Sequence, residues 1–531
     1  MGLRGRGVAC PVMLPDSNNR SPSPDGVARG ARLIAANSLL MYARMAVVTA
    51  INLYTVRLVL QALGVEDFGT YDVVAGLVTI GAAGSNVLAT STQRFYSVSM
   101  GLRDECRLRR VFSSSVVLAL LMSVLVVLIA ETAGMWAINH YLSIPPGRVE
   151  AASQVFHLSV LAFVLGIIHT PFSSAILAHE HLGVYAGVSI GECFAKLAAA
   201  ALISAQPFDR LVFHGVSLLA ISSAVATAFI VVALRRYPAC RFEQHQERGL
   251  YQEMISFSGW SFFGSLAGVG LNQVITVLVN VFFGPTASAA RAISVQIGNA
   301  ISTFTGSLIT AVKPALIRSH AEVDHAYLDV VFALSNKAIF YGLLMVCLPL
   351  AIEMDAVLAL WLGVEDPQTI LFCRLIVVYA FIMALNNPIS IVIQATGRIR
   401  EYNLIVEFFT LMCVPAVYLL FRAGFNASAA YWAMIASATF AHAARLWCLR
   451  RYYPVFDLRK YLRSFLVPGL CITAVVASAS LVAGAQIQGG VLRLISYLVL
   501  SAGLTPILAY FFGLTDGERM LVKRIIPRKA G

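Results

Sequence analysis

Residues 73–89 read VVAGLVTIGAAGSNVLA, and residues 90–110, which follow directly, read TSTQRFYSVSMGLRDECRLRR. The first stretch has no charged residue and approaches the length of about 20 apolar residues that a helix needs to cross a bilayer. The second stretch carries Arg94 and then four more arginines, Arg103, Arg107, Arg109 and Arg110. Lys and Arg collect in short loops on the cytoplasmic side of a membrane. The two stretches therefore predict a spanning helix over 71–98 with an arginine anchor at its inner end.

Composition extends this prediction to the whole chain. The 531 residues are 58% hydrophobic and only 12% charged, with a mean hydropathy of +0.77. Soluble domains are about a quarter charged. The chain is therefore predicted to be an all-α integral membrane protein that crosses the membrane many times and leaves no room for a large soluble domain.

The chain lacks the motifs of common enzyme classes. It contains no phosphate-binding P-loop, no GxSxG elbow and no HExxH zinc motif. The nine cysteines include no CxxC pair, so neither a disulfide framework nor a metal site is expected. We therefore expect a protein that is not an enzyme, with no catalytic residue, no cofactor, no metal and no nucleic-acid partner.

Hydropathy along the chain predicts about 14 transmembrane helices. Their limits are 33–59, 71–98, 111–138, 154–178, 182–205, 210–234, 254–282, 287–317, 329–352, 368–396, 402–421, 427–449, 463–485 and 490–513. When the N-terminus is placed in the cytoplasm, most of the 39 Lys and Arg residues fall in inner segments. The outer segments hold only Arg148, Arg210, Arg291, Arg422 and Arg493. This asymmetry predicts that both termini are cytoplasmic.

A faint internal repeat divides the chain. At a constant offset of 220 residues, Asn52 and Gly64 align with Asn272 and Gly284. Six spans per unit gives parallel repeats, which bind substrate between the two halves in transporters of this kind. The predicted domains are a disordered cytoplasmic tail over 1–30, a six-helix lobe over 31–236, a cytoplasmic linker over 237–252, a second six-helix lobe over 253–450, and two additional transmembrane helices with a basic cytoplasmic tail over 451–531.

Two stretches carry a resemblance to a known family. The sequence RLVLQALGVEDFGTYDVVAGLV over 57–78, followed by STQRFYSVSMG over 91–101, resembles the start of Wzx-type polysaccharide flippases. These flippases belong to the multidrug/oligosaccharidyl-lipid/polysaccharide (MOP) exporter superfamily. The L-G-x-x-x-F/Y-G-x-Y pattern is shared across polysaccharide exporters, and the Q-R-F ending is typical of one bacterial subgroup.

The resemblance implies a function and a location. It implies translocation of an undecaprenyl-pyrophosphate-linked oligosaccharide across the bacterial cytoplasmic (inner) membrane by alternating access, for O-antigen lipopolysaccharide or another cell-surface polysaccharide. The partners then expected are the lipid-linked oligosaccharide, membrane lipids, a coupling ion (H⁺ or Na⁺), a polysaccharide polymerase and glycosyltransferases. The alternative is a cation-coupled drug or metabolite exporter of the same superfamily.

Basic residues inside predicted spans provide the candidate site. A charge at the bilayer centre costs roughly 2.5 to 3.5 kcal/mol on insertion scales, so it needs a partner, water or a route to the interface. Arg44 lies twelve residues beyond Arg32, which is about 18 Å along a helix and near the bilayer centre. Its span contains no acidic residue, and the competing carboxylates on other spans are Glu131, Glu192 and Glu407. A basic cavity suits an anion, because guanidinium groups match pyrophosphate oxygens with paired donors.

The residues expected to line this cavity and bind substrate are Arg44, Arg57, Arg94, Arg291, Lys313, Asn52 and Asn272. Several of them also have a structural interpretation. Arg94, Lys313 and Lys337 lie about two turns from inner ends, where long side chains can extend to the headgroups. Asn52 and Asn272 would bond either sugar hydroxyls or a neighbouring helix. Lys196 follows Glu192 by four residues on one helix, so this pair is expected to neutralise itself.

Overall fold

The computed structural model describes residues 24–101, 104–179, 181–240, 248–321, 325–363, 365–395, 399–453, 456–487, 489–515 and 517–519. Within this part every regular element is a helix, and no strand occurs. The all-α prediction is therefore confirmed. Residues 1–23 of the predicted tail and residues 241–247 of the predicted linker lie outside the described part, and the first helix already begins at Pro24.

The helices of the first half include two short 3-10 turns (η2, η3) and one π-helical turn (η1). In chain order they are α1 (Pro24–Leu63), α2 (Val65–Thr79), α3 (Ala82–Gly101), α4 (Glu105–Ile129), η1 (Ala130–Gly134), α5 (Met135–His140), η2 (Pro146–Arg148), α6 (Val149–Ala178), α7 (Leu182–Leu202), η3 (Ile203–Ala205) and α8 (Arg210–Arg236).

The second half opens with a very long helix and ends with a π-helical turn. Its elements are α9 (Arg248–Ala321), α10 (His325–Ile352), α11 (Met354–Leu362), α12 (Pro367–Ala395), α13 (Ile399–Arg422), α14 (Ala429–Tyr452), α15 (Leu458–Tyr461), η4 (Leu462–Leu466), α16 (Val467–Gly484), α17 (Gly490–Leu508) and η5 (Ala509–Gly513).

Eleven helices of the described part are long and apolar enough to cross a membrane, or twelve if the bent pair α2–α3 forms one span. The predicted number of 14 is not confirmed. Two features account for the difference. The long helix α9 contains a kink at Gly284 that separates the predicted spans 254–282 and 287–317. Helix α14, which corresponds to the predicted span 427–449, is not among the eleven, because its sequence is interrupted by polar and basic side chains.

Residues 71–98 do not form the one continuous helix that hydropathy predicts. Helix α2 ends at Thr79, α3 begins at Ala82, and the two are bent by 46° relative to one another. Gly81 lies in the break, where a Cβ atom would come within 2.8 Å of the ring of Phe163. The close approach of this ring to the backbone accompanies a break that hydropathy alone does not reveal.

Two compact units make up the fold. Unit 1 comprises residues up to Thr55, Leu77–Ala137 and Glu150–Leu266. In it α3 packs on α4 and α7 on α8, around a core that includes Tyr96, Phe112, Ile176 and Phe229. Large apolar side chains on one face of α4 stay exposed, Leu121 by 62% among them. An apolar exposed face of this kind is typical of a helix that contacts lipid.

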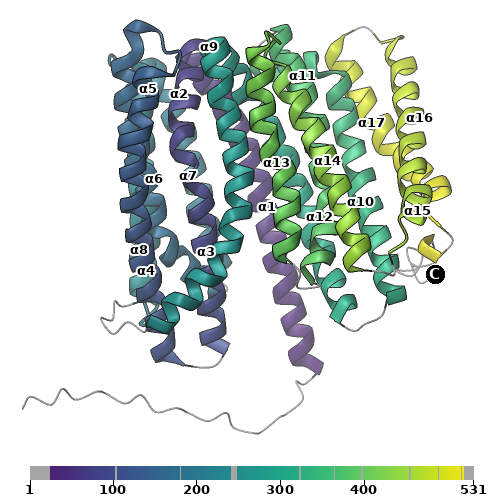
Figure 1. Cartoon of the computed structure of the whole chain (residues 1–531), viewed down its shortest axis with the longest axis horizontal. Helices are drawn as coiled ribbons and strands as arrows, with labels where there is room; N and C mark the ends of the chain where they lie inside the picture. The colour runs from purple at the N-terminus through teal and green to yellow at the C-terminus, as the bar shows by residue number, and fades with distance from the viewer. Residues whose placement is uncertain are drawn as a thin grey trace, which may run out of the picture. The chain divides into compact units, whose positions relative to one another are not determined.

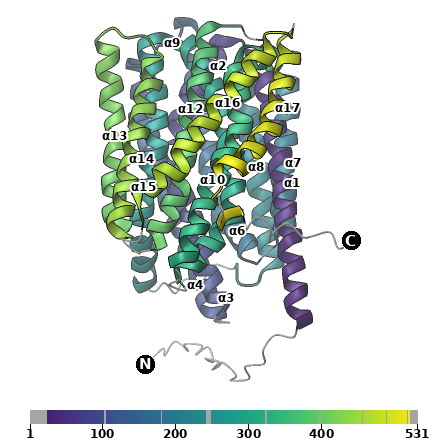
Figure 2. The same ribbon diagram turned by 90° about the vertical axis from the view of Figure 1, so that its right-hand side faces the viewer.

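Unit 2 comprises Val56–Gly76, Ile138–Val149 and Ala267–Gly531. Helix α14 packs between α12 and α13, and α10 packs on α12 (Figure 1). The last two long helices, α16 and α17, pack on each other and on α10 (Figure 2). The two C-terminal helices expected beyond the repeats are therefore part of this unit and pack on α10.

A matched pair of glycines supports the internal repeat. Gly64 precedes α2 and Gly284 lies at the kink of α9, and both have φ of 81°. This left-handed conformation is readily adopted only by glycine. The two residues are aligned at the offset of 220 residues, so the repeat is visible in the backbone as well as in the sequence.

Candidate functional site

Arg44 lies on α1 in unit 1 and faces α7. Its guanidinium carbon lies 4.8 Å from the ring centroid of Tyr185. Eight residues further along each helix, the Sγ atom of Cys193 lies 3.8 Å from Oδ1 of Asn52. Eight residues of helix span about 12 Å, so α1 and α7 run side by side in the same direction. We refer to Arg44, Asn52, Tyr185 and Cys193 as the α1–α7 strip.

The Arg44 guanidinium is only partly satisfied. The side chain is half-buried, and its Nε atom is buried without a hydrogen-bond partner among the described residues. Among the described residues, no carboxylate pairs with it. A cation over an aromatic ring gains about 0.5 to 2 kcal/mol but leaves the N–H donors available. Within the described part of the chain, Arg44 therefore has an aromatic neighbour and no acidic partner.

The competing carboxylates have other partners or neighbours. Glu131, in the π-helical turn η1, lies 3.0 Å from Nδ1 of His157. Glu192 forms the expected ion pair with Lys196 at 2.6 Å. Glu407 lies in unit 2, close enough to Arg445 for the two charges to interact.

Arg291 lies on α9 in unit 2 and is fully buried, with 0% exposure. Its Nε donates to Oγ1 of Thr276 at 2.9 Å, and one terminal nitrogen donates to the carbonyl oxygen of Asn272 at 3.0 Å. The other terminal nitrogen lies 3.9 Å from the sulfur of Met434. Asp72 on α2 is near enough to interact electrostatically. This guanidinium is enclosed by protein groups, unlike that of Arg44.

The remaining predicted site residues are spread over both units. Arg57 donates to the carbonyl oxygen of Leu360 at 3.2 Å in unit 2. The side-chain amide of Asn272 donates to the carbonyl oxygen of Gly268 at 3.2 Å. Arg94 is exposed on α3. Lys313 lies in α9, and its side chain is outside the described part.

One charge behaves differently from the prediction. Lys337 was expected to extend to the headgroups, and this is wrong. It is 1% exposed, and its ammonium forms an ion pair with Glu518 at 2.7 Å. Glu518 also accepts from the backbone N–H of Thr515 at 2.7 Å. The two charged residues are 181 positions apart, so no local pattern signals the pair.

Sequence reasoning also missed Tyr185, His157 as the partner of Glu131, and Asp72 as the neighbour of Arg291. Each lies on a different helix from the residue that it contacts. A local signal was present only for Glu192 and Lys196, at the i to i+4 spacing of neighbours on one helix face.

No protein-family profile matches the sequence, and no curated protein sequence matches it. Solved structures do match. A multidrug resistance MATE family transporter of the MOP superfamily, in an inward-facing conformation, has a TM-score of 0.65 at 15% identity. The match covers 79% of this chain and 98% of that one. The outward-facing conformation of a MATE family transporter gives 0.59 at 15% identity, over 80% and 96% of the two chains.

A third similar structure is a MOP superfamily transporter from Pyrococcus furiosus, described as having a binding pocket of reverse polarity that suggests a different function. It has a TM-score of 0.60 at 15% identity and covers 80% of this chain and 96% of that one. At these identities the likeness concerns the fold alone. The protein thus has the fold of MATE transporters of the MOP superfamily, and about a fifth of the chain lies outside the match.

Proposed function

We propose that the protein is a membrane exporter that works by alternating access and carries a lipid-linked oligosaccharide with a pyrophosphate group, as in undecaprenyl-pyrophosphate-linked glycans. The observation that supports this substrate class is the incompletely bonded guanidinium of Arg44. Glu192, next to Cys193 of the strip, is already neutralised by Lys196. The charge that remains is therefore the positive charge of Arg44. A positive group at this depth suits an anion and disfavours an organic cation.

The competing proposal is a cation-coupled exporter of drugs or metabolites, and the fold is compatible with both. MATE transporters with this fold are described as multidrug resistance proteins. The Pyrococcus furiosus transporter, however, is described as having reverse pocket polarity, so one fold accommodates pockets of different sign. The sign of the charge along the α1–α7 strip is the feature that favours the anionic substrate here.

A binding measurement tests the proposal directly. Purified protein in detergent is titrated with undecaprenyl pyrophosphate and, separately, with the organic cation ethidium. Removal of one charge-assisted contact with Arg44→Ala is expected to weaken undecaprenyl pyrophosphate binding roughly 10- to 100-fold. Arg44→Lys should retain part of the affinity because the charge remains, and Arg44→Glu should abolish binding by repulsion.

The matched control is Arg235→Ala, which removes an exposed arginine at the end of α8 in the same unit. It should leave binding unchanged. The same four variants are then tested at equal membrane levels for restoration of glycan export in a bacterium that lacks its own flippase. Normal binding and export by Arg44→Ala, or tight binding of ethidium by the wild type that Arg44→Glu strengthens, would reject the anionic substrate and favour the drug exporter.

A further inference from the structure

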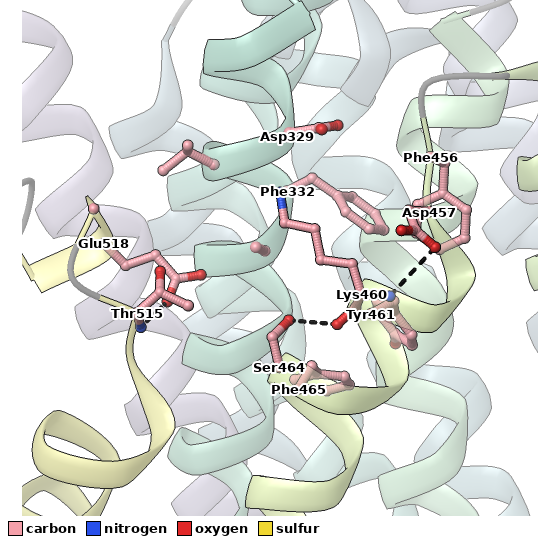
Figure 3. Close-up of a pocket in the computed structure, with 13 residues that line it drawn as sticks. Asp329, Phe332, Phe456, Asp457, Lys460, Tyr461, Ser464, Phe465, Thr515 and Glu518 are labelled. Atoms are coloured by element: carbon pink, nitrogen blue, oxygen red, sulfur yellow. Dashed lines mark hydrogen bonds between the residues drawn. The ribbon is translucent and has the colours of Figure 1, made fainter.

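A cavity of about 370 Å³ lies within unit 2, and none of its lining residues belongs to the α1–α7 strip. Three elements line it: α10, the α15–η4 segment, and the residues that follow η5 (Figure 3). Its volume falls in the range of sites for small molecules, roughly 300 to 1,000 Å³. It does not take part in the proposed transport site.

One wall of the cavity is aromatic. Phe332, Phe456, Tyr461 and Phe465 line it, and each is at most 8% exposed. The rings pack edge to face or tilted, with centroids 5.9 Å apart for Phe332 and Phe456 and 4.9 Å apart for Tyr461 and Phe465. This wall is an apolar surface of packed rings.

Four charged residues line the cavity: Asp329, Asp457, Lys460 and Glu518. Asp457 caps α15, since it accepts from the backbone N–H groups of Arg459 and Lys460 at 2.8 and 3.3 Å. Lys460, on α15, extends its side chain toward α10, where Asp329 is located (Figure 3). Among the described residues, none of the ion pairs involves the Lys460 ammonium. Asp329 accepts from the hydroxyl of Tyr453 at 3.4 Å, which is a long hydrogen bond for two oxygens. Glu518 also lines the cavity, but its charge is balanced by Lys337.

A buried hydroxyl provides an independent observation. Tyr461 is 6% exposed, and its hydroxyl has no hydrogen-bond partner within the described part of the chain. A buried polar group without a partner is unfavourable by about 1 to 3 kcal/mol, and polar groups left in this way call for an explanation such as a missing ligand or water. A ligand with a polar atom next to the aromatic wall would satisfy it.

The cavity lies where spans end. Asp329 begins one candidate membrane span, Leu458 begins a second, and Gly513 ends a third. The lining residues come from these ends and from the residues next to them. Ends of spans lie at the depth of lipid headgroups, so the lining residues lie at the depth that a lipid headgroup occupies.

We propose that this cavity binds the headgroup of a phospholipid that carries both a phosphate and a primary ammonium, as phosphatidylethanolamine does. Lys460 contacts the phosphate, Asp329 accepts hydrogen bonds from the ammonium, and the Tyr461 hydroxyl donates to a headgroup oxygen. The aromatic wall contacts the glycerol and the first methylene groups. Separated charges of opposite sign match a zwitterion, and a carboxylate that accepts N–H bonds distinguishes a primary ammonium from a trimethylammonium group, which has no N–H.

The test uses the delipidated full-length protein in detergent, with bound lipid counted by native mass spectrometry. Phosphatidylethanolamine, phosphatidylglycerol and phosphatidylcholine with identical acyl chains are offered separately. We expect phosphatidylethanolamine to bind at least about tenfold more tightly than the other two. Lys460→Gln should weaken phosphatidylethanolamine and phosphatidylglycerol alike, whereas Asp329→Asn should weaken only phosphatidylethanolamine, to the level of phosphatidylglycerol. Lys460→Arg keeps the positive charge and should therefore retain the lipid binding that Lys460→Gln loses.

The matched control is Arg459→Gln, which removes a positive charge from the adjacent exposed residue, outside the cavity lining. It should leave the lipid preference unchanged. Equal binding of the three lipids by the wild type, or the same loss with Arg459→Gln as with Lys460→Gln, would overturn the proposal. Soluble O-phosphoethanolamine is the last arm. If it binds as tightly as the lipid, the ligand is a free small molecule and the lipid assignment is wrong.

Discussion

Unit 1 and unit 2 each hold an arginine in a helix long enough to cross a membrane, and the two guanidinium groups have opposite surroundings. Arg291 is 0% exposed and directs its nitrogens to Thr276, the Asn272 carbonyl and Met434. Arg44 is half-buried and lies over the ring of Tyr185, and in the part of the chain that the structure describes its Nε has no hydrogen-bond partner. Arg291 also lies next to a tyrosine ring, because its guanidinium carbon is 5.5 Å from the ring centroid of Tyr431.

The difference shows that the presence of a charged side chain in an apolar helix does not reveal its role. What separates the two is the number of donors that the protein itself satisfies. An arginine whose donors are all bonded inside the fold contributes to stability, and one with spare donors can bind a ligand. Four substitutions, ordered from the largest expected effect on stability to the smallest, test this distinction.

Arg291→Ala should have the largest effect. It removes two hydrogen bonds and leaves a cavity the size of a long side chain, so we expect a loss of about 3 to 5 kcal/mol in the stability of unit 2. Thermal unfolding of the purified protein in detergent, followed by tryptophan fluorescence, measures the loss. Arg422→Ala, at an exposed arginine of the same unit, should change little. An unaltered melting temperature for Arg291→Ala would mean that the enclosed guanidinium is not structural.

Lys337→Met should destabilise nearly as much, by about 3 kcal/mol, because it leaves Glu518 as a buried charge without its cation. The double variant Lys337→Met with Glu518→Gln should recover most of the loss, since the glutamine still accepts from the Thr515 N–H. The same unfolding experiment on both singles and the double completes a thermodynamic cycle. Additive effects of the two single changes would show that the pair is not coupled.

Gly69→Ala should destabilise unit 2 by about 1 to 3 kcal/mol. A Cβ atom at Gly69 on α2 would come within 2.0 Å of the carbonyl oxygen of Pro285 on α9, near the segment that carries Arg291. The matched control is Gly191→Ala on α7, where a Cβ atom meets nothing within 4 Å. That change should be neutral or slightly stabilising because alanine favours a helix. Equal melting temperatures for the two variants would contradict the close packing of α2 on α9.

Arg44→Leu should have the smallest effect, a change in stability of no more than about 1 kcal/mol, because only a contact with the Tyr185 ring is lost. Tyr185→Leu should give a similar change. A destabilisation as large as that of Arg291→Ala would remove the contrast between the two arginines, and with it the argument for a ligand at Arg44.

The class of the protein could be predicted from local sequence. Membrane insertion depends on the summed transfer free energy of about 20 neighbouring residues, so hydropathy is sufficient to recognise an all-helical membrane chain. Local geometry likewise made the Glu192–Lys196 pair predictable, because residues four apart share a helix face. The internal repeat likewise aligns Gly64 with Gly284, and the two residues share a left-handed φ of 81°.

Tertiary structure decided everything that depends on two distant segments. The partner of Lys337 lies 181 residues away, and the ring that contacts Arg44 belongs to α7. The break between α2 and α3 is accompanied by a close approach of Phe163 from another helix. The sequence by itself determined the helices and which of them carry charges, because both follow from neighbouring residues. Only packing decided which charges are satisfied inside the protein, because each partner is supplied by a helix that the local pattern does not identify.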